Sequence, residues 1–89
     1  MRRAQRDRED IHAYIARRDP ARASHVLATI ATAVNRLADL PALGRPGLKP
    51  GTRELVIPRL PYIAVYRVRG ERVQILRVLH TAREWSGRE

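Results

Sequence analysis

Apolar residues in the first half of the chain recur at intervals of three and four positions, which is the spacing of one face of an α-helix. One such stretch covers residues 4–18, and a second covers residues 20–40 and ends before a proline. Asp19 followed by Pro20 is typical of a helix N-cap and the first helical position. The pattern predicts two helices that pair as an antiparallel hairpin over residues 3–40.

In the second half of the chain, apolar residues tend to recur at every second position, which is the spacing of one face of a β-strand. Residues 41–51 hold three prolines and three glycines, a density that predicts a shaped loop. Three runs rich in β-branched and aromatic residues follow within residues 52–80, separated by residues 58–61 and 69–71. They predict a meander of three antiparallel strands.

Alternation within the strands predicts which side chains meet the helices. In the middle run we expect one apolar set to face one way, comprising Tyr62, Ala64, Tyr66 and Val68. In the last run we expect a strict alternation of Val73, Ile75, Arg77 and Leu79 with Gln74, Leu76, Val78 and His80. We therefore expect residues 1–89 to form a single α+β domain, a helical hairpin on a three-stranded antiparallel meander, with a polar tail at residues 81–89.

Basic residues outnumber acidic ones, with a formal net charge of +9 and an isoelectric point of about 11.5. Residues 1–44 contribute +3, from eight Arg against five Asp and Glu, and residues 45–89 contribute +6, from ten Lys and Arg against four Glu. Such an excess attracts nucleic acid, ribosomes or an acidic polypeptide. We therefore expect an anionic partner.

The chain contains no cysteine, so neither a disulfide framework nor a thiolate metal site is available. No stretch approaches the ~20 apolar residues that a membrane-spanning helix needs. Charges run through residues 1–18, so no signal peptide is expected there. These features predict a cytoplasmic protein without cofactor, metal or membrane attachment.

An ordered set of motifs follows the predicted hairpin: LGRP, RELV, PYIAVYRV and ILRVLHTAREW. Together with the hairpin, the set covers residues 4–85 and resembles the ParE branch of the RelE/ParE toxins. The resemblance implies the toxin of a type II toxin–antitoxin system, associated with growth arrest and plasmid stabilisation. It also implies a cognate antitoxin whose acidic C-terminal segment wraps the toxin in a hetero-oligomer.

One feature departs from that family, whose members usually begin with a strand before the first helix. Here the helical pattern starts almost directly at Met1. We therefore expect a sheet without that strand and with one exposed edge, whose backbone groups are open to pairing by another chain.

The superfamily divides into ribosome-dependent mRNA endoribonucleases and poisons of DNA gyrase. An RNase that uses 2′-hydroxyl attack needs a base, an acid and cations around one phosphate. Nuclease-type members commonly carry an arginine after the middle-strand tyrosine and a further tyrosine near the C-terminus. Here Ile63 follows Tyr62, and no tyrosine follows Tyr66. Both departures favour a non-enzymatic gyrase inhibitor, with the endoribonuclease and a non-toxic antitoxin-binding remnant as alternatives.

Two overlapping sets of candidate site residues follow from these alternatives. The nuclease alternative would use Arg53, Arg67, Arg77 and His80, with His80 as general acid or base. Binding of the target or antitoxin would use Arg53, Arg67, Arg77, Arg83 and Trp85. We expect Arg67 and Arg77 to project from one face as an anion clamp, although an ion pair with Glu54 would also satisfy them. The simpler role of His80 is a structural hydrogen bond, and that of Trp85 is to cover the sheet edge.

Overall fold

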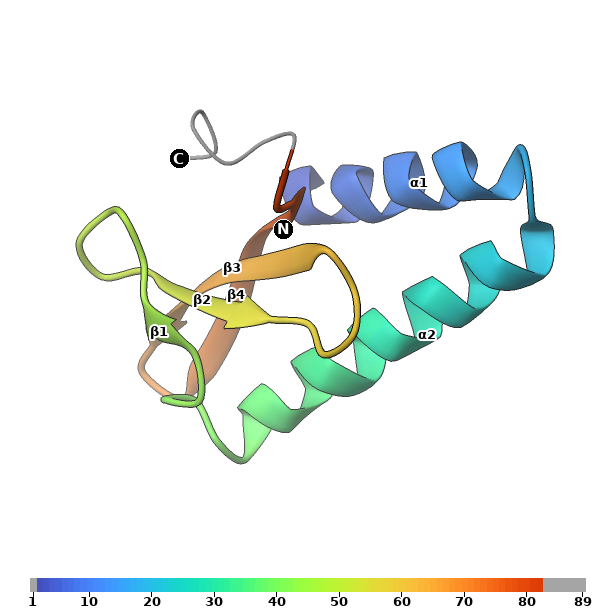
Figure 1. The fold of residues 1–89 in the computed structure, drawn as a ribbon. Helices are drawn as coiled ribbons and strands as arrows, with labels where there is room; N and C mark the ends of the chain where they lie inside the picture. Colours follow the sequence, from blue (N-terminus) through green and yellow to red (C-terminus); the bar gives the residue numbers. More distant parts are fainter. Residues whose placement is uncertain (1, 83–89) are drawn as a thin grey trace.

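The computed structural model describes residues 2–82 and has two helices packed on one side of an antiparallel sheet (Figure 1). The helices are α1, Arg2–Ala16, and α2, Pro20–Asn35, which continues as the 3₁₀ turn η1, Arg36–Ala38. The strands are β1, Arg45–Pro46; β2, Arg53–Val56; β3, Tyr62–Arg69; and β4, Arg72–His80. The predicted α+β class is confirmed.

The predicted start of α2 is confirmed in atomic detail. The Asp19 side chain accepts a hydrogen bond from the Arg22 amide at 3.0 Å, and Pro20 occupies the first helical turn. The helix ends at Asn35, several residues before the predicted end, because the chain tightens into η1. That tighter turn places Leu37 in the core, where it is fully buried.

The sheet has four strands in the order β1-β2-β3-β4, so the prediction of three strands was wrong. The additional strand is β1, which lies inside the segment predicted to be a loop and pairs antiparallel with β2 at Arg53 and Glu54. The prolines and glycines of residues 41–51 predicted a loop, so the sequence pattern did not indicate this strand. A short edge strand tolerates proline because one of its sides needs no partner.

The predicted strict alternation along β4 was also wrong. Val65 of β3 pairs with Arg77, but the next residue, Tyr66, pairs with Ile75, which leaves Leu76 as an extra residue in a β-bulge. An inserted residue reverses the alternation of side chains beyond it. Ile75 therefore packs with the helix-facing core, whereas Arg77 lies on the opposite face with Val65.

The sheet edge expected to be exposed is partly closed. β4 is the last strand in the sheet order, and α1 packs along it. The Asp7 carboxylate of α1 accepts a hydrogen bond from the Val78 amide at 2.9 Å. It also accepts hydrogen bonds from Nε and Nη2 of Arg77, at 2.7 and 3.0 Å. α1 thus supplies a side-chain partner where a neighbouring strand would supply backbone groups.

Two apolar clusters lie on opposite faces of the sheet. The larger joins both helices to the sheet, and the smaller consists of Ile63, Val65 and Leu79. The buried members of the larger cluster are Ile11, Val26, Ile30, Ala33, Leu37, Leu55, Ile57, Tyr62, Ala64, Tyr66 and Val78. The predicted helix-facing set of β3 is confirmed for its first three members, whereas Val68 is 42% exposed near the strand end.

Candidate functional site

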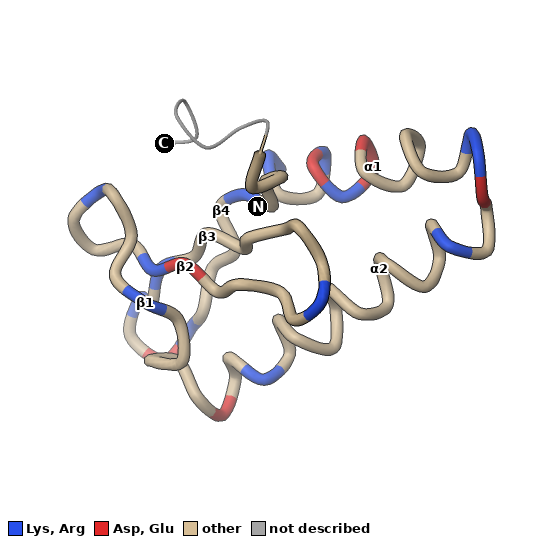
Figure 2. Tube along the Cα trace, viewed as in Figure 1, with Lys and Arg blue, Asp and Glu red and all other residues tan. Residues whose placement is uncertain are grey.

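The exposed face of α2 carries no charge over most of its length. Residues 23–35 contain no Lys, Arg, Asp or Glu, whereas α1 mixes arginines with acids from its first turns (Figure 2). A helix face that meets only water is normally rich in charged and polar groups. This face of α2 therefore has the composition of a contact surface.

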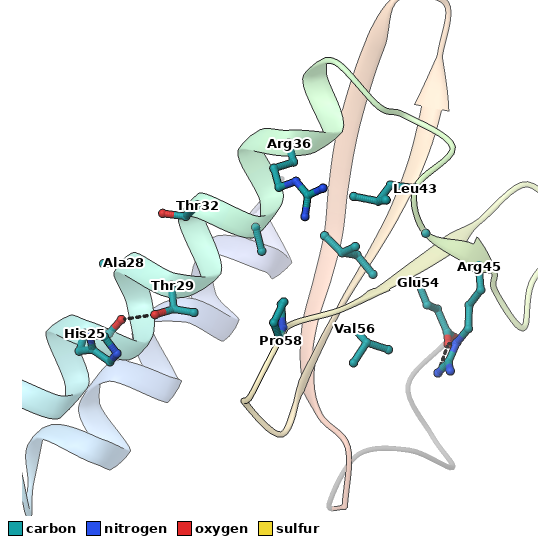
Figure 3. A pocket seen from close by; sticks show the side chains of 13 residues that line it. His25, Ala28, Thr29, Thr32, Arg36, Leu43, Arg45, Glu54, Val56 and Pro58 are labelled. Carbon is teal, nitrogen blue, oxygen red and sulfur yellow. Dashed lines mark hydrogen bonds and ion pairs between the residues drawn. The ribbon is translucent and has the colours of Figure 1, made fainter.

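A groove of about 760 Å³ runs between this face of α2 and β2 (Figure 3). Small or hydroxyl-bearing side chains form its helix wall, namely Ala28, Thr29, Thr32 and Ala33. Its other wall is mainly apolar and consists of Leu43, Leu55, Val56 and Pro58. Val56 is 48% exposed because β1 pairs with β2 only as far as Glu54. We call this feature the α2–β2 groove.

Two arginines line the α2–β2 groove, one at the end nearest η1 and one on the sheet wall. Arg36 is exposed at the end nearest η1, whereas Arg45 lies beyond Leu43 with its guanidinium turned toward Glu54 (Figure 3). Arg45 Nη2 is 3.1 Å from Oε1 of Glu54, whose side chain is 3% exposed, while half of the Arg45 side chain remains exposed. The groove thus combines an apolar wall with a basic end, which suits an amphipathic segment with acidic residues.

The loop that closes this end of the groove is fixed by Tyr66. The buried Tyr66 hydroxyl donates to the Pro41 carbonyl at 2.7 Å and accepts from the Gly44 amide at 2.8 Å. A Cβ on residue 44 would approach the Tyr66 ring and hydroxyl to 2.7 Å, so only glycine fits there. Leu43 is therefore held at the groove although it lies in an irregular segment.

Arg67 and Arg77, two of the predicted site residues, share the sheet face opposite the helices, as expected from their strands. Their partners differ from the Glu54 considered for them. Arg77 pairs with Asp7 of α1, and Nε of Arg67 donates to Gln74 Oε1 at 2.6 Å. The face is shared, but Arg77 is already engaged by a carboxylate of its own chain.

Arg53 lies on the other face of the sheet from Arg67. It pairs with Tyr66 in the strand register, and its Nη1 donates to the Gly44 carbonyl at 2.7 Å. The guanidinium of Arg53 therefore supports the loop beside the groove and stays partly accessible.

His80 lies at the far end of β4, on the helix-facing side with its cross-strand partner Tyr62. The two rings meet edge to face with centroids 5.4 Å apart. His80 Nδ1 accepts a hydrogen bond from the Ala82 amide at 3.1 Å. These contacts match the structural role weighed for His80 in the sequence.

The structure does not assemble the four nuclease candidates into one site. Arg53 and His80 pair with β3 residues four positions apart, Tyr66 and Tyr62, which corresponds to about 13 Å along the strand. Arg67 and Arg77 lie on the opposite face. Arg83 and Trp85, the remaining predicted binding residues, lie outside the described residues.

Sequence reasoning missed the residues of the α2–β2 groove. The charge-free run of residues 23–35 was the available signal, because it leaves both faces of one helix without charge. Within residues 2–82, no group of three or more His, Asp or Glu side chains could hold a metal ion. No helix in that part of the chain is long and apolar enough to cross a membrane.

Comparison with known proteins identifies relatives over nearly the full length. A family model described as the ParE toxin of the type II toxin–antitoxin system parDE matches residues 1–85. Y4kP of Sinorhizobium fredii, described as a candidate toxin, is 48% identical over 83 residues, which is 93% of this chain and 85% of that protein. Toxin RelE1 of Caulobacter vibrioides is 32% identical over 80 residues, covering 88% and 85% of the two chains.

A solved structure shares the fold as well as part of the sequence. A chain from the chromosomal ParDE TA system of P. aeruginosa superposes with a TM-score of 0.82 at 31% identity. The match covers 90% of this chain and 89% of that one.

Proposed function

Because the chain belongs to the ParE toxin family of type II toxin–antitoxin systems, we propose that it inhibits DNA gyrase by protein–protein contact and that an antitoxin bound in the α2–β2 groove silences it. The family supports an antitoxin partner, and the groove offers that partner an apolar wall with a basic end. Gyrase is the target that best fits the chemistry of the described residues.

The observation that carries the choice of gyrase is the separation of the nuclease candidates. Cleavage of RNA requires base, acid and cations within contact distance of one phosphate. Arg53 and His80 lie far apart on one face of the sheet, and Arg67 and Arg77 lie on the other. Inhibition by binding needs no such convergence.

Purified toxin is expected to block supercoiling by gyrase and to leave mRNA intact in a coupled translation reaction. His80→Ala is expected to keep full inhibition of supercoiling, because His80 makes structural contacts at the end of β4. Gel electrophoresis of plasmid topoisomers and of the mRNA provides both measurements. Cleaved mRNA with unaffected supercoiling would support the endoribonuclease, and no effect in either assay would support the non-toxic remnant.

Antitoxin binding is expected to depend on the α2 wall of the groove. Thr32→Glu places a carboxylate and added bulk in the path of an acidic amphipathic segment. We expect it to weaken binding of the cognate antitoxin by roughly thirty-fold, corresponding to about 2 kcal/mol at a central contact. Isothermal titration calorimetry with the co-expressed antitoxin, separated and re-added, measures the change.

Ala31→Glu is the matched control for this variant. Ala31 is exposed on the same helix, one residue away, but does not line the groove. Its substitution adds the same charge and is expected to leave antitoxin affinity within about twofold, since surface changes away from a contact are worth under ~0.5 kcal/mol. Equal losses in both variants would place the antitoxin elsewhere.

A further inference from the structure

The end of the β3–β4 hairpin gathers three arginines on one face of the sheet. Arg67 and Arg69 are two residues apart on β3, so they point the same way. Arg72 of β4 pairs directly with Arg69, which places it on that face too. The pair has Cβ atoms about 5 Å apart, and Arg67 follows about 6.6 Å along the strand. We call these three residues the hairpin arginines.

Charges of one sign directly opposite each other destabilise an antiparallel pair. Within residues 2–82, no ion pair joins any hairpin arginine to a carboxylate. Glu71, which lies between Arg69 and Arg72, is the only acid from Leu55 to Ala82. Glu54 lies on the same sheet face opposite Val65, but its carboxylate is paired with Arg45, so the surroundings offer little compensation. Gln74 binds Arg67 Nε and thereby orients that guanidinium without neutralising it. The arrangement favours an external anion.

The character of the surface distinguishes between possible anionic ligands. Of the exposed large apolar side chains of the described residues, the one on the hairpin itself, Val68, points to the opposite face. Val56 shares the face of the hairpin arginines but lies on β2 opposite Ile63, four positions along β3 from Arg67. A peptide would therefore find little apolar surface to bury. Tyr62 and Tyr66 are buried on the helix side, so they offer no stacking platform for unpaired bases. Phosphates along a duplex need only accessible cations.

We propose that the hairpin arginines bind the phosphate backbone of double-stranded DNA, without preference for base sequence. Arginine donates two parallel hydrogen bonds to a phosphate, and each contact releases condensed counterions. The hairpin arginines lie at the far end of the sheet from His80 and outside the α2–β2 groove lining. This binding surface stands independently of the proposed gyrase inhibition.

The test is fluorescence anisotropy of a labelled mixed-sequence duplex titrated with the full chain at several salt concentrations. Three phosphate contacts are expected to contribute a slope of about −2.7 to log K against log salt, or a loss of about forty-fold between roughly 50 and 200 mM. Arg67→Gln/Arg69→Gln/Arg72→Gln is expected to remove that contribution. Arg69→Gln/Arg72→Gln keeps the Arg67–Gln74 bond, changes only exposed residues and is expected to remove about two thirds of it.

Arg2→Gln/Arg3→Gln/Arg6→Gln on α1 is the charge-matched control. All three residues are exposed, and their removal lowers the net charge by the same amount. We expect this control to retain the salt slope of the unmodified chain. Equal loss in both triple variants would show that net charge alone drives binding and would overturn the proposal. Tighter binding of a glutamate-rich peptide than of the duplex, lost in the hairpin variants, would overturn it in favour of a carboxylate site. Neither result would change the outcome of the supercoiling assay.

Discussion

Replacing Tyr66 with alanine is expected to lower the free energy of unfolding by about 4 kcal/mol, the range for removing a fully buried aromatic ring. Tyr66 is 0% exposed and packs in the larger core cluster. The total stability of a domain of this length is about 4–13 kcal/mol, so the expected loss is between about a third and all of it. Chemical denaturation followed by circular dichroism gives the change in unfolding free energy.

Tyr66→Phe separates the ring from the hydroxyl. The ring remains, but the Gly44 amide and Pro41 carbonyl lose their shared partner. Leaving buried polar groups unsatisfied costs about 1–3 kcal/mol, so we expect the phenylalanine variant to fall between the native chain and the alanine variant. Val68→Ala is the control on the same strand and face, where 42% exposure predicts a small change. Equal effects of Tyr66→Phe and Val68→Ala would mean that the hydroxyl does not hold the loop.

Asp7→Ala is expected to destabilise the protein by about 3 kcal/mol, because it leaves the Arg77 guanidinium partly buried without its counterion. The two side chains are only 12% and 17% exposed, so solvent screens their attraction weakly. The change also removes the hydrogen-bond partner of the Val78 amide. Equilibrium denaturation measures the loss, and Asp10→Ala, an exposed acid on the same helix, is expected to cost far less.

A double-mutant cycle isolates the Asp7–Arg77 pair from other effects of either change. Asp7→Ala and Arg77→Ala are measured singly and together, and we expect a coupling energy of about 1–3 kcal/mol. Additive effects of the two substitutions would mean that the pair does not bind α1 to β4. If Asp7→Ala lowers the free energy of unfolding no more than Asp10→Ala does, the conclusion that the pair binds α1 to β4 is contradicted as well.

The candidate site was only partly predictable. The shared face of Arg67 and Arg77 was predicted from strand alternation and confirmed. The bulge at Leu76, which the alternation did not predict, determines which side chains of β4 face the helices. The partner of Arg77 lies 70 positions earlier in the chain, so no local pattern could indicate it. The α2–β2 groove arises where α2 passes β2. Of its two walls, only the helix wall could be recognised in the sequence, from the run of residues 23–35 without charged side chains.

The sequence by itself determined the two helices and the order of β2, β3 and β4 after them, the N-cap at Asp19, the helix-facing side chains of β3 and the family. The helices and strands depend on which residues are apolar at a given period, and burial of apolar surface acts residue by residue. The N-cap depends on a carboxylate directly before Pro20, which is equally local. The tertiary structure alone decided the pairing of β1, the bulge in β4, the Asp7 contact at the sheet edge and the α2–β2 groove. These depend on hydrogen bonds and contacts between distant segments, whose geometry exists only once the helices are packed on the sheet.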